Sequence, residues 1–213
     1  MPKPQADPAM TGNASRLVLA SGSATRHAML EAAGIAVDVS PADVDEAAIR
    51  DRLLADNPTV PHARIALALA EEKAKAVSAQ REDALVIGAD QVLSFEGRLF
   101  EKPRDMHDAR ASLVALRGKT HALHSAVALA VNGETVWHAT ADANLTMRAF
   151  SDAALDAYLA RVGDVVLTSV GAYQIEGPAI QLFAAVEGDH ATILGMPLLP
   201  LVSELVRRGA LEA

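Results

Sequence analysis

Short apolar runs alternate with helical patterns through the first half of this chain. Residues 16–20 and 36–40 have the length of short strands, and 84–87 is a run of the right length for a buried strand. Between them, apolar residues recur with helical spacing in a segment that ends near Gly34 and over about 62–80. Strands that alternate with helices predict an α/β fold.

The middle of the chain has an antiparallel pattern instead. The segments 121–131 and 134–147 flank Asn132-Gly133, which is the strongest short-range hairpin signal in the sequence. A second hairpin is predicted within 85–103, where two short apolar runs precede a turn at Glu96-Gly97. Further elements are predicted as helices over about 105–116, 152–161 and 197–208, an extended or irregular segment over 165–171 and a strand over 181–186. We therefore expect an α/β fold with a mixed, partly antiparallel sheet flanked by helices, and two lobes around a cleft.

The first residues of the chain differ from the remainder. Residues 1–15 contain three prolines and no apolar run, so we expect a disordered leader and not a signal peptide. Residues 16–213 are long enough to bury a sizeable core, and we expect one domain there. No run approaches the roughly 18 apolar residues that cross a bilayer, so we expect no membrane partner.

Composition narrows the classes of function. The chain has no cysteine, which excludes disulfide scaffolds, zinc–thiolate sites and cysteine nucleophiles, and is compatible with a reducing, cytoplasmic location. The formal net charge is -8 and no cluster of Lys and Arg is visible, which argues against a nucleic acid polymer as partner. A small anionic ligand is compatible with this charge, because a few placed cations and a divalent metal suffice to bind it.

A turn of small residues, from Ser21 to Arg26, joins the first strand to the first helix. A strand, a small-residue turn and a helix in this order direct backbone N–H groups and a helix N-terminus towards an anion. Ser23 is a suitable N-cap, and an anionic partner would explain why Arg26 lies in the first turn, where a cation is unfavourable. The alternative is a plain N-cap with a solvated arginine, and no GxxxxGK[ST] loop is present.

Carboxylates occur at two places that suit a metal ion. Asp43, Asp45 and Glu46 lie within four residues, and oxygen ligands of this kind suit Mg²⁺ or Mn²⁺. The alternative is that Asp45 caps the following helix and Glu46 sits in its first turn. Asp90 at a strand end, with Lys102 just past the returning strand, can hold a metal and a phosphate. The alternative there is a surface hairpin with solvated charges.

Two further sets of residues are weaker candidates. Lys73 and Lys75 point to different faces of a predicted helix, where most lysines are simply solvated. His121, His124 and His138 have no recognisable ligand spacing across a sheet, so we expect these histidines to be half-buried or at the surface.

Eight motifs follow one another along the chain, and in this order they resemble the Maf family of nucleoside triphosphate pyrophosphatases. They are LVLASGSATR, DVDE, LAEEKA, GADQV, EKP, LRGKTH with its preceding helix, GAYQIEG and EGDHATILGMPL, and the resemblance covers about 17–208. It implies a two-lobed, mixed α/β fold (Maf or ITPase-like) that is commonly a homodimer in the cytoplasm. It also implies hydrolysis of a nucleoside triphosphate to a monophosphate and pyrophosphate, with a divalent metal, Mg²⁺ or Mn²⁺, as cofactor.

The resemblance assigns roles by position. The phosphate-binding turn S-x-S-x-x-R corresponds to Ser21, Ser23 and Arg26, and the catalytic residues correspond to Glu46, Lys73, Asp90 and Lys102. These residue types suit hydrolysis of a phosphoanhydride. Glu46 and Asp90 can hold the metal, and Asp90 can take the proton of the attacking water. The cations that can neutralise phosphate oxygens are Arg26, Lys73 and Lys102.

Three further positions are associated with substrate choice in the family, here Thr25, Gln91 and Glu176. The branch that acts on dTTP and UTP carries Arg, Thr and Gln there, whereas the 7-methyl-GTP branch carries Trp, Gln and Glu. The chain therefore looks closer to the 7-methyl-GTP branch and departs from it at Thr25, because threonine cannot stack on a base. We expect a purine nucleotide or 7-methyl-GTP to be preferred over dTTP.

Other functions stay open on the sequence alone. One is a nucleotide-binding regulator of cell division with little turnover, which the family's link to division control suggests and which the retained acids and lysines argue against. Another is a dTTP/UTP pyrophosphatase. A third is a phosphomonoesterase with an aspartyl nucleophile, for which Asp43-Val44-Asp45 is a poor context.

Overall fold

A single mixed sheet forms the centre of the molecule. The computed structural model describes residues 16–212, so the leader predicted over 1–15 lies outside the described residues. Seven strands form the sheet, in the order β2-β1-β3-β5-β6-β7 with β4 paired to β3. They are β1 (Arg16–Leu19), β2 (Asp38–Val39), β3 (Ala84–Phe95), β4 (Arg98–Phe100), β5 (Thr120–Val131), β6 (Glu134–Met147) and β7 (Phe183–Glu187). β1 is parallel to β2 and β3 and the other pairings are antiparallel, which confirms the predicted mixed sheet.

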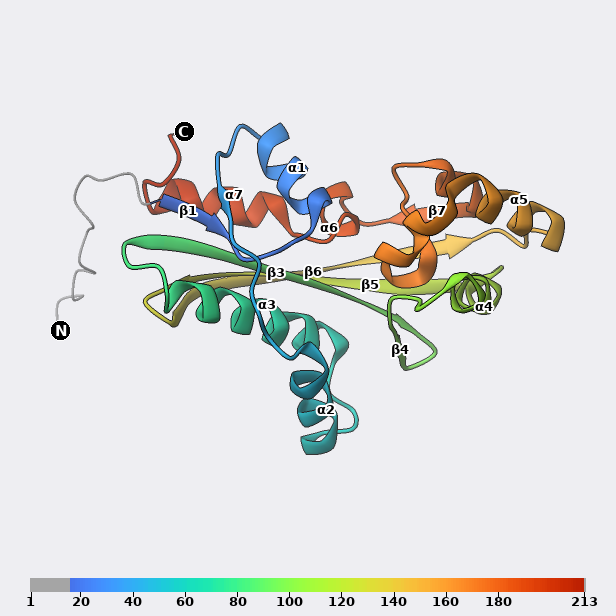
Figure 1. Ribbon diagram of the computed structural model, residues 1–213, viewed down its shortest axis with the longest axis horizontal. Coiled ribbons are helices and arrows are strands. Elements are labelled where there is room, and N and C mark those ends of the chain that lie inside the picture. The colour runs from blue at the N-terminus through green and yellow to red at the C-terminus, as the bar shows by residue number, and fades with distance from the viewer. Residues whose placement is uncertain (1–15, 213) are drawn as a thin grey trace, which may run out of the picture.

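Helices cover both faces of the first lobe (Figure 1). α3 (His62–Ser78) lies on one face, with α2 (Glu46–Asp56) beyond it, and its apolar side chains pack against the alanines of β5. α1 (Ala24–Ala32) and α7 (Leu198–Arg207) lie on the other face. Their leucines pack against Leu17, Ile87 and Leu129 of the sheet. The strands β1 and β3 are therefore covered on both sides, as their continuous apolar runs predict.

A second lobe surrounds the far ends of β5 and β6 (Figure 1). Its elements are α4 (Met106–Leu116), α5 (Asp152–Val162) and the 3₁₀ helices η1 (Gly163–Thr168), η2 (Val170–Ala172) and η3 (Pro178–Leu182). They enclose a separate apolar cluster that includes Leu113, Leu145 and Leu155. The short α6 (His190–Ile193) leads back to the first lobe. Among the helices of 16–212, none combines the length and the hydropathy needed to cross a bilayer.

Gly88 allows α3 to approach β3 closely. A Cβ at this position would lie 2.1 Å from the carbonyl oxygen of Ala70 and 2.8 Å from the Cβ of Ala74, so a larger residue would force the helix away. Lys73 belongs to the same stretch of α3, and Asp90 follows Gly88 by two residues on the same face of β3. The close approach therefore brings Lys73 and Asp90 together.

The secondary structure agrees with the prediction at the main hairpin and at the predicted helices, and departs from it at β3, at residues 163–172 and at the start of the last strand. Asn132 and Gly133 both have positive φ, 49° and 83°, as the predicted Asn-Gly turn requires. β3 is one strand of 12 residues and not two short runs. Residues 163–168 and 170–172 form 3₁₀ helices where the sequence predicts an extended or irregular segment over 165–171, and the last strand begins at 183 and not at 181.

Candidate active site

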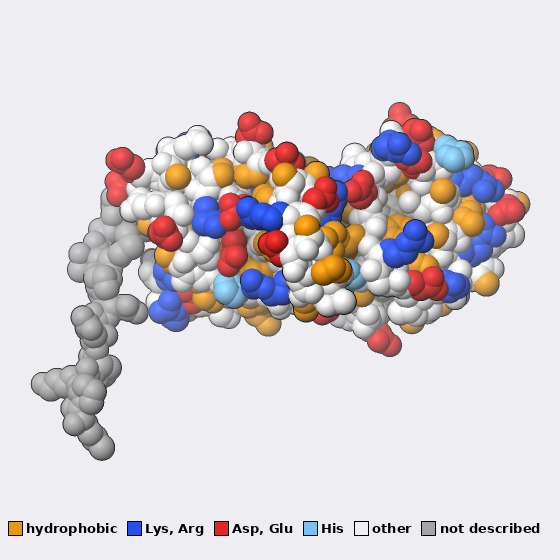
Figure 2. Space-filling view, turned by 90° about the horizontal axis from the view of Figure 1, so that it is seen from below, with side chains coloured by type: hydrophobic (Ala, Val, Ile, Leu, Met, Phe, Trp, Pro, Cys, Tyr) orange, Lys and Arg blue, Asp and Glu red, His pale blue; other side chains and the backbone are white. Residues whose placement is uncertain are grey.

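The two lobes face each other across a cleft of about 1030 Å³. Figure 2 shows the molecule narrowing between the lobes, with acidic and basic side chains close together at this waist. The lining comes from the starts of α1 and α2 and from β3 on one side, and from η1, η2 and the turn before η3 on the other. All ten site residues that the sequence predicts line it: Ser21, Ser23, Thr25, Arg26, Glu46, Lys73, Asp90, Gln91, Lys102 and Glu176.

Lys73 joins the two acids of the cleft. Its Nζ donates a hydrogen bond to Oδ1 of Asp90 at 2.5 Å and lies 2.7 Å from Oε1 of Glu46. The side chains of Lys73 and Asp90 are 10% and 9% exposed, whereas that of Glu46, at the start of α2, is 55% exposed. One ammonium thus holds a buried and a half-exposed carboxylate towards the same point. The alternatives of a solvated lysine and a solvated Asp90 are wrong.

The buried position of Asp90 changes its acidity. Burial raises the pKa of this carboxyl above its ordinary value, because a carboxylate loses solvation inside the protein. The charges of Lys73 and Arg26 lower the pKa and that of Glu46 raises it, so burial outweighs the two cations. A carboxylate with a raised pKa is a stronger base than a solvated one. Asp90 is therefore chemically suited to accept a proton from water.

Hydrogen bonds order the turn that follows β1. Oγ of Ser23 accepts a hydrogen bond from the N–H of Arg26 at 3.3 Å and caps α1, as predicted. The guanidinium of Arg26 donates to Oγ of Ser21 at 3.1 Å and to the carbonyl oxygen of Gly195 at 2.9 Å. Burial lowers the pKa of Arg26, and the negative charge of Asp90 opposes this shift. Arg26 is therefore a cation that hydrogen bonds fix in the cleft lining, and the alternative of a solvated arginine is wrong.

The carboxylates at 43–46 separate in the structure. Oδ1 of Asp45 accepts a hydrogen bond from the N–H of Ala48 at 2.9 Å and caps α2. Asp43 is exposed and does not line the cleft. Asp45 caps α2 and Glu46 lies in its first turn, as the capping interpretation has it, and of the three acids only Glu46 also lines the cleft.

Glu46 and Asp90 are suited to share a divalent cation. Both carboxylates lie within 2.7 Å of the same ammonium, so their oxygens converge on a small volume, and Mg²⁺ and Mn²⁺ prefer such oxygen ligands. A second group of possible ligands lies at the exposed start of α4: Asp105, His107 and Asp108. There Asp105 caps the helix and Asp108 pairs with a neighbouring arginine, which explains both carboxylates without a metal ion.

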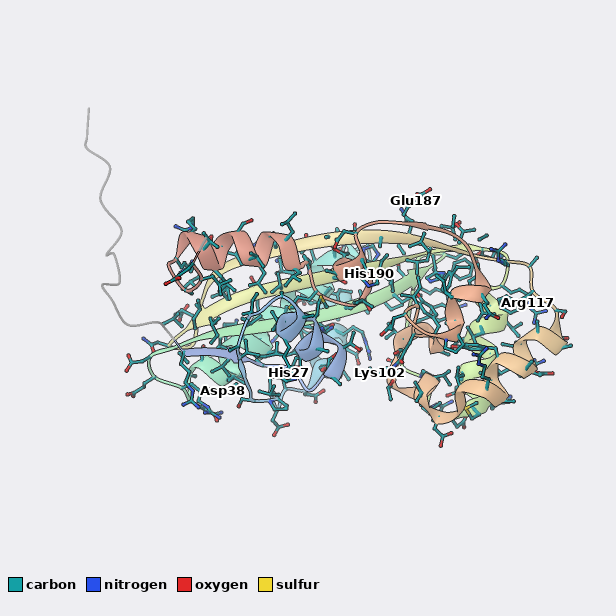
Figure 3. All side chains as sticks on the ribbon, turned by 90° about the horizontal axis from the view of Figure 1, so that it is seen from above. His27, Asp38, Lys102, Arg117, Glu187 and His190 are labelled. Atoms are coloured by element: carbon teal, nitrogen blue, oxygen red, sulfur yellow. The ribbon has the colours of Figure 1, made fainter. Side chains whose placement is uncertain are left out.

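Charged residues at the rim complete the lining. Lys102 follows β4 and Glu176 lies in the turn before η3, and both are exposed. Figure 3 places Lys102 between the two lobes. Arg50, which the sequence does not single out, also lines the cleft and pairs with Glu101 at 2.7 Å. A single arginine within a helix carries no sequence signal, so this cation could not be predicted.

Ser125 is a buried polar residue that the sequence does not identify as part of the site. It is 1% exposed in β5, at the start of an apolar run that continues to Val131, and its Oγ lies 2.9 Å from Nε2 of Gln91. A signal was present in the sequence, because a lone hydroxyl in a buried strand requires a hydrogen-bond partner.

The histidines differ from one another in burial. His121 is 2% exposed, so the prediction of a half-buried or surface position is wrong for it. Its Nε2 lies 2.7 Å from Oη of Tyr173, which lines the cleft, and burial lowers the pKa of His121 to about 4. His124 is only part-buried and contacts Oγ of Ser94 at 2.9 Å and Oδ1 of Asp142 at 2.8 Å. His124, Ser94 and Asp142 do not line the cleft.

The sequence matches a family model and several known proteins over most of its length. The family model described as Maf-like protein matches residues 16–208. A "7-methyl-GTP pyrophosphatase" of Rhizobium meliloti (strain 1021) is 49% identical over 197 residues, which are 92% of this chain and 98% of that protein. A "Nucleoside triphosphate pyrophosphatase" of Paramagnetospirillum magneticum (strain ATCC 700264 / AMB-1) is 54% identical over 196 residues, 91% of this chain and 99% of that protein. A "7-methyl-GTP pyrophosphatase" of Brucella abortus biovar 1 (strain 9-941) is 47% identical over 92% of this chain and 98% of its own length.

Proposed function

This chain belongs to the Maf family, and from that premise we propose that it is a nucleoside triphosphate pyrophosphatase, a hydrolase that cleaves the anhydride between the α and β phosphates. The observation that carries the proposal is the meeting of Glu46, Lys73 and Asp90 within 2.7 Å in a cleft that also holds the predicted phosphate-binding turn. The names of the relatives that match 92% and 91% of this chain support it. The products are a nucleoside monophosphate and pyrophosphate.

The first turn of α1 binds the phosphate chain in this proposal. Ser21, Ser23 and the first residues of α1 line the cleft, and the free N–H groups at a helix N-terminus suit an anion. Arg26 uses two of its donors on Ser21 and Gly195, and the donors that are left can contact phosphate oxygens. Lys102, exposed at the rim, neutralises the charge that develops on the departing pyrophosphate.

Asp90 acts as the general base in this proposal. Its carboxylate, oriented by Lys73, takes the proton of the attacking water, for which its raised pKa is favourable. Glu46 and Asp90 would hold a divalent metal, Mg²⁺ or Mn²⁺, which when bound offsets the charge of the phosphates and orients water. Lys73 keeps the two carboxylates close to each other and is one of the four cations that line the cleft.

We further propose that the substrate is a guanine nucleotide, with 7-methyl-GTP as the first candidate. The exposed carboxylate of Glu176 can accept hydrogen bonds from the N1–H and amino groups of guanine, or meet the positive charge of a methylated purine. Gln91 lines the cleft beside Asp90, and Thr25 offers no aromatic surface for stacking. Two of the relatives described above are named 7-methyl-GTP pyrophosphatase, which supports the same choice.

A substrate panel tests the reaction and the base preference together. The purified protein is incubated with Mg²⁺ or Mn²⁺ and with GTP, 7-methyl-GTP, ATP, dTTP or UTP, and the products are separated. We expect a monophosphate and pyrophosphate, formed fastest from a guanine nucleotide. Orthophosphate and a diphosphate as products would contradict the cleaved bond. Faster hydrolysis of dTTP or UTP than of any guanine nucleotide would agree with a pyrophosphatase and overturn the base preference.

The Asp90→Asn variant separates an enzyme from a nucleotide-binding regulator. An enzyme of the proposed mechanism loses turnover by about 10²–10³-fold when its base is removed. A regulator binds nucleotide with negligible turnover both before and after the substitution. Turnover that is unchanged in the variant would remove Asp90 from catalysis.

We also propose a homodimer in the cytoplasm, from the resemblance to the family. Light scattering coupled to gel filtration measures the mass of the protein in solution. A mass of one chain at micromolar concentration would contradict the dimer. Cell fractionation tests the location separately.

A further inference from the structure

The side-chain amide of Gln91 has a defined orientation. Its Nε2 lies 2.9 Å from Oγ of Ser125, 3.0 Å from the carbonyl oxygen of Thr192 and 3.0 Å from that of Ile193. Carbonyl oxygens only accept hydrogen bonds, so the atom that faces them must be the amino group. Within the described part of the chain Oε1 has no hydrogen-bond partner, and it is not sealed from solvent. Gln91 therefore offers an acceptor, and not a donor, to a ligand in the cleft.

Ser125 supports this orientation from within the sheet. It lies directly opposite Gln91 in the β3–β5 register and is 1% exposed. Its hydroxyl donates to the carbonyl oxygen of Thr192 at 2.7 Å, which leaves the lone pairs of Oγ to accept from Gln91. Both hydrogen-bonding capacities of this buried hydroxyl are thus used, one on Gln91 and one on the backbone that also holds Gln91.

The same backbone segment reaches the phosphate-binding turn. Three residues after Thr192, the carbonyl oxygen of Gly195 accepts a hydrogen bond from Nε of Arg26 at 2.9 Å. Gly195 has φ of +105°, a conformation that other residues rarely adopt, and its backbone passes close to the Arg26 guanidinium. Segment 192–195 therefore anchors Gln91 at one end and Arg26 at the other, and Ser125 ties this segment to the sheet.

We propose that Ser125 is a positioning residue for nucleobase selection. Its hydroxyl holds the Gln91 amide so that Oε1 faces the base, which favours bases that present a hydrogen-bond donor, such as the amino group of guanine. Thymine and uracil present carbonyl oxygens beside their single N–H, and an acceptor that faces a carbonyl oxygen gains nothing. This inference rests on the proposed function, because it concerns the nucleotide that the cleft selects.

Ser125→Thr and Ser125→Val form a matched pair for the test. Threonine and valine have nearly the same shape, so both variants carry about the same strain from the added volume. They differ in the hydroxyl group, which only threonine keeps. We expect Ser125→Val to lower kcat/KM for the preferred guanine nucleotide by about two- to tenfold relative to Ser125→Thr, the effect of one hydrogen bond. The loss should appear in KM, with kcat little changed, and the ratio of kcat/KM between guanine nucleotide and dTTP should fall by the same factor.

Inorganic tripolyphosphate serves as a probe without a base. Its inhibition constant should be equal in the two variants, because Ser125 acts on the base end. An equal loss for guanine nucleotide, dTTP and tripolyphosphate would show a merely structural role and overturn the inference. If the wild type hydrolyses nucleotides and both variants keep its ratio of kcat/KM between guanine nucleotide and dTTP, the role of Ser125 is overturned and the proposed function stands. If the wild type hydrolyses no nucleotide, the proposed function fails. Equilibrium binding of GTP and dTTP to the two variants then decides the role of Ser125, and equal ratios would reject it.

Discussion

Among single residues, Lys73 decides how the two acids of the cleft are arranged. Without its ammonium, Asp90 and Glu46 would face each other as like charges, and the pKa of Asp90 would lose the strongest influence that lowers it. We expect Lys73→Met to lower kcat by about 10²–10³-fold. We also expect the acid limb of the pH–rate profile to move to higher pH, because the base then becomes protonated at a higher pH. Steady-state kinetics over a pH series measure both effects.

Lys75→Met is the matched control for this prediction. Lys75 lies on the same helix, pairs with Glu72 and does not line the cleft. A partly exposed ion pair of this kind contributes about 0–1 kcal/mol to stability. Because Lys75 also lies outside the cleft lining, kcat should stay close to that of the wild type. A Lys73→Met variant with the kcat of Lys75→Met would remove Lys73 from the reaction.

The burial of His121 should make the protein less stable at acidic pH. Its pKa is about 4 in the folded state against 6.5 as the ordinary value, so the folded state favours neutral imidazole. This contribution is fully present above pH 6.5 and is lost as the pH falls towards 4, where the unfolded chain binds the proton first. The loss is on the order of 3 kcal/mol. His121→Gln can keep a hydrogen bond to Tyr173 and cannot titrate, so its free energy of unfolding should fall less over this range.

Urea unfolding of wild type and His121→Gln at both ends of this pH range measures the difference. His107→Gln is the control, because the side chain of His107 is 90% exposed. The control should follow the wild type. Parallel pH dependence in wild type and His121→Gln would contradict the buried neutral histidine.

Arg26, Ser125 and His121 show which roles of single residues could be predicted from the sequence. Arg26 is anomalous within its own helix turn, so a local pattern was enough to suggest that it is held in a site. The hydroxyl of Ser125 signals that a partner is needed, but neither Ser125 nor His121 shows which one, because their partners are distant in the sequence. The hydrogen bonds of Ser125 reach Gln91 and Thr192 across 34 and 67 residues. Burial at these positions is a consequence of packing between strands, which a single sequence does not reveal.

Among the elements, the contact between α3 and β3 depends on a missing side chain. Gly88→Ala would place a Cβ 2.1 Å from a backbone oxygen of α3, and backbone cannot rotate away as a flexible side chain can. We expect a loss of about 1–3 kcal/mol in the free energy of unfolding together with a fall in kcat, because the displaced helix carries Lys73 away from Asp90. Denaturant unfolding and kinetics on the same preparation measure both quantities.

Gly22→Ala is the stability control for Gly88→Ala. Its added Cβ would meet only Pro41, at 3.7 Å, which is an ordinary contact. Its free energy of unfolding should therefore stay near that of the wild type. Full stability and an unchanged kcat in Gly88→Ala would show that α3 can shift without cost to the site.

At the level of elements, β3 shows why the sequence predicts two short apolar runs where the structure has one strand. Asp90 and Gln91 interrupt its apolar pattern, and polar residues between two apolar runs usually mark the end of a strand. The strand continues because each side chain has a partner in the fold, Lys73 for Asp90 and Ser125 for Gln91. By contrast, the hairpin at Asn132-Gly133 depends only on local backbone preferences, and it was predicted correctly.

At the scale of the whole molecule, charge is distributed unevenly in relation to the cleft. The chain carries a formal net charge of -8, yet the cleft lining balances four cations, Arg26, Arg50, Lys73 and Lys102, against four acids, Glu46, Asp90, Glu101 and Glu176. A triphosphate would therefore enter a nearly neutral cleft in an acidic protein. Its own negative charge then needs a further counter-charge, which is a physical reason to expect a divalent metal with the substrate.

Because both lobes line the cleft, a bound nucleotide should stabilise the whole molecule and not one lobe. A non-hydrolysable triphosphate analogue with Mg²⁺, at about 100 times its Kd, adds about 2.7 kcal/mol to the free energy of unfolding by mass action. For a chain of this length that raises Tm by about 5–10 °C. Guanosine lacks the phosphates that Arg26 and Lys102 would contact, so at the same concentration its shift should be smaller. Scanning calorimetry measures both shifts. An equal shift with guanosine would contradict the phosphate contacts, and two transitions of which only one moves would show that the lobes unfold independently.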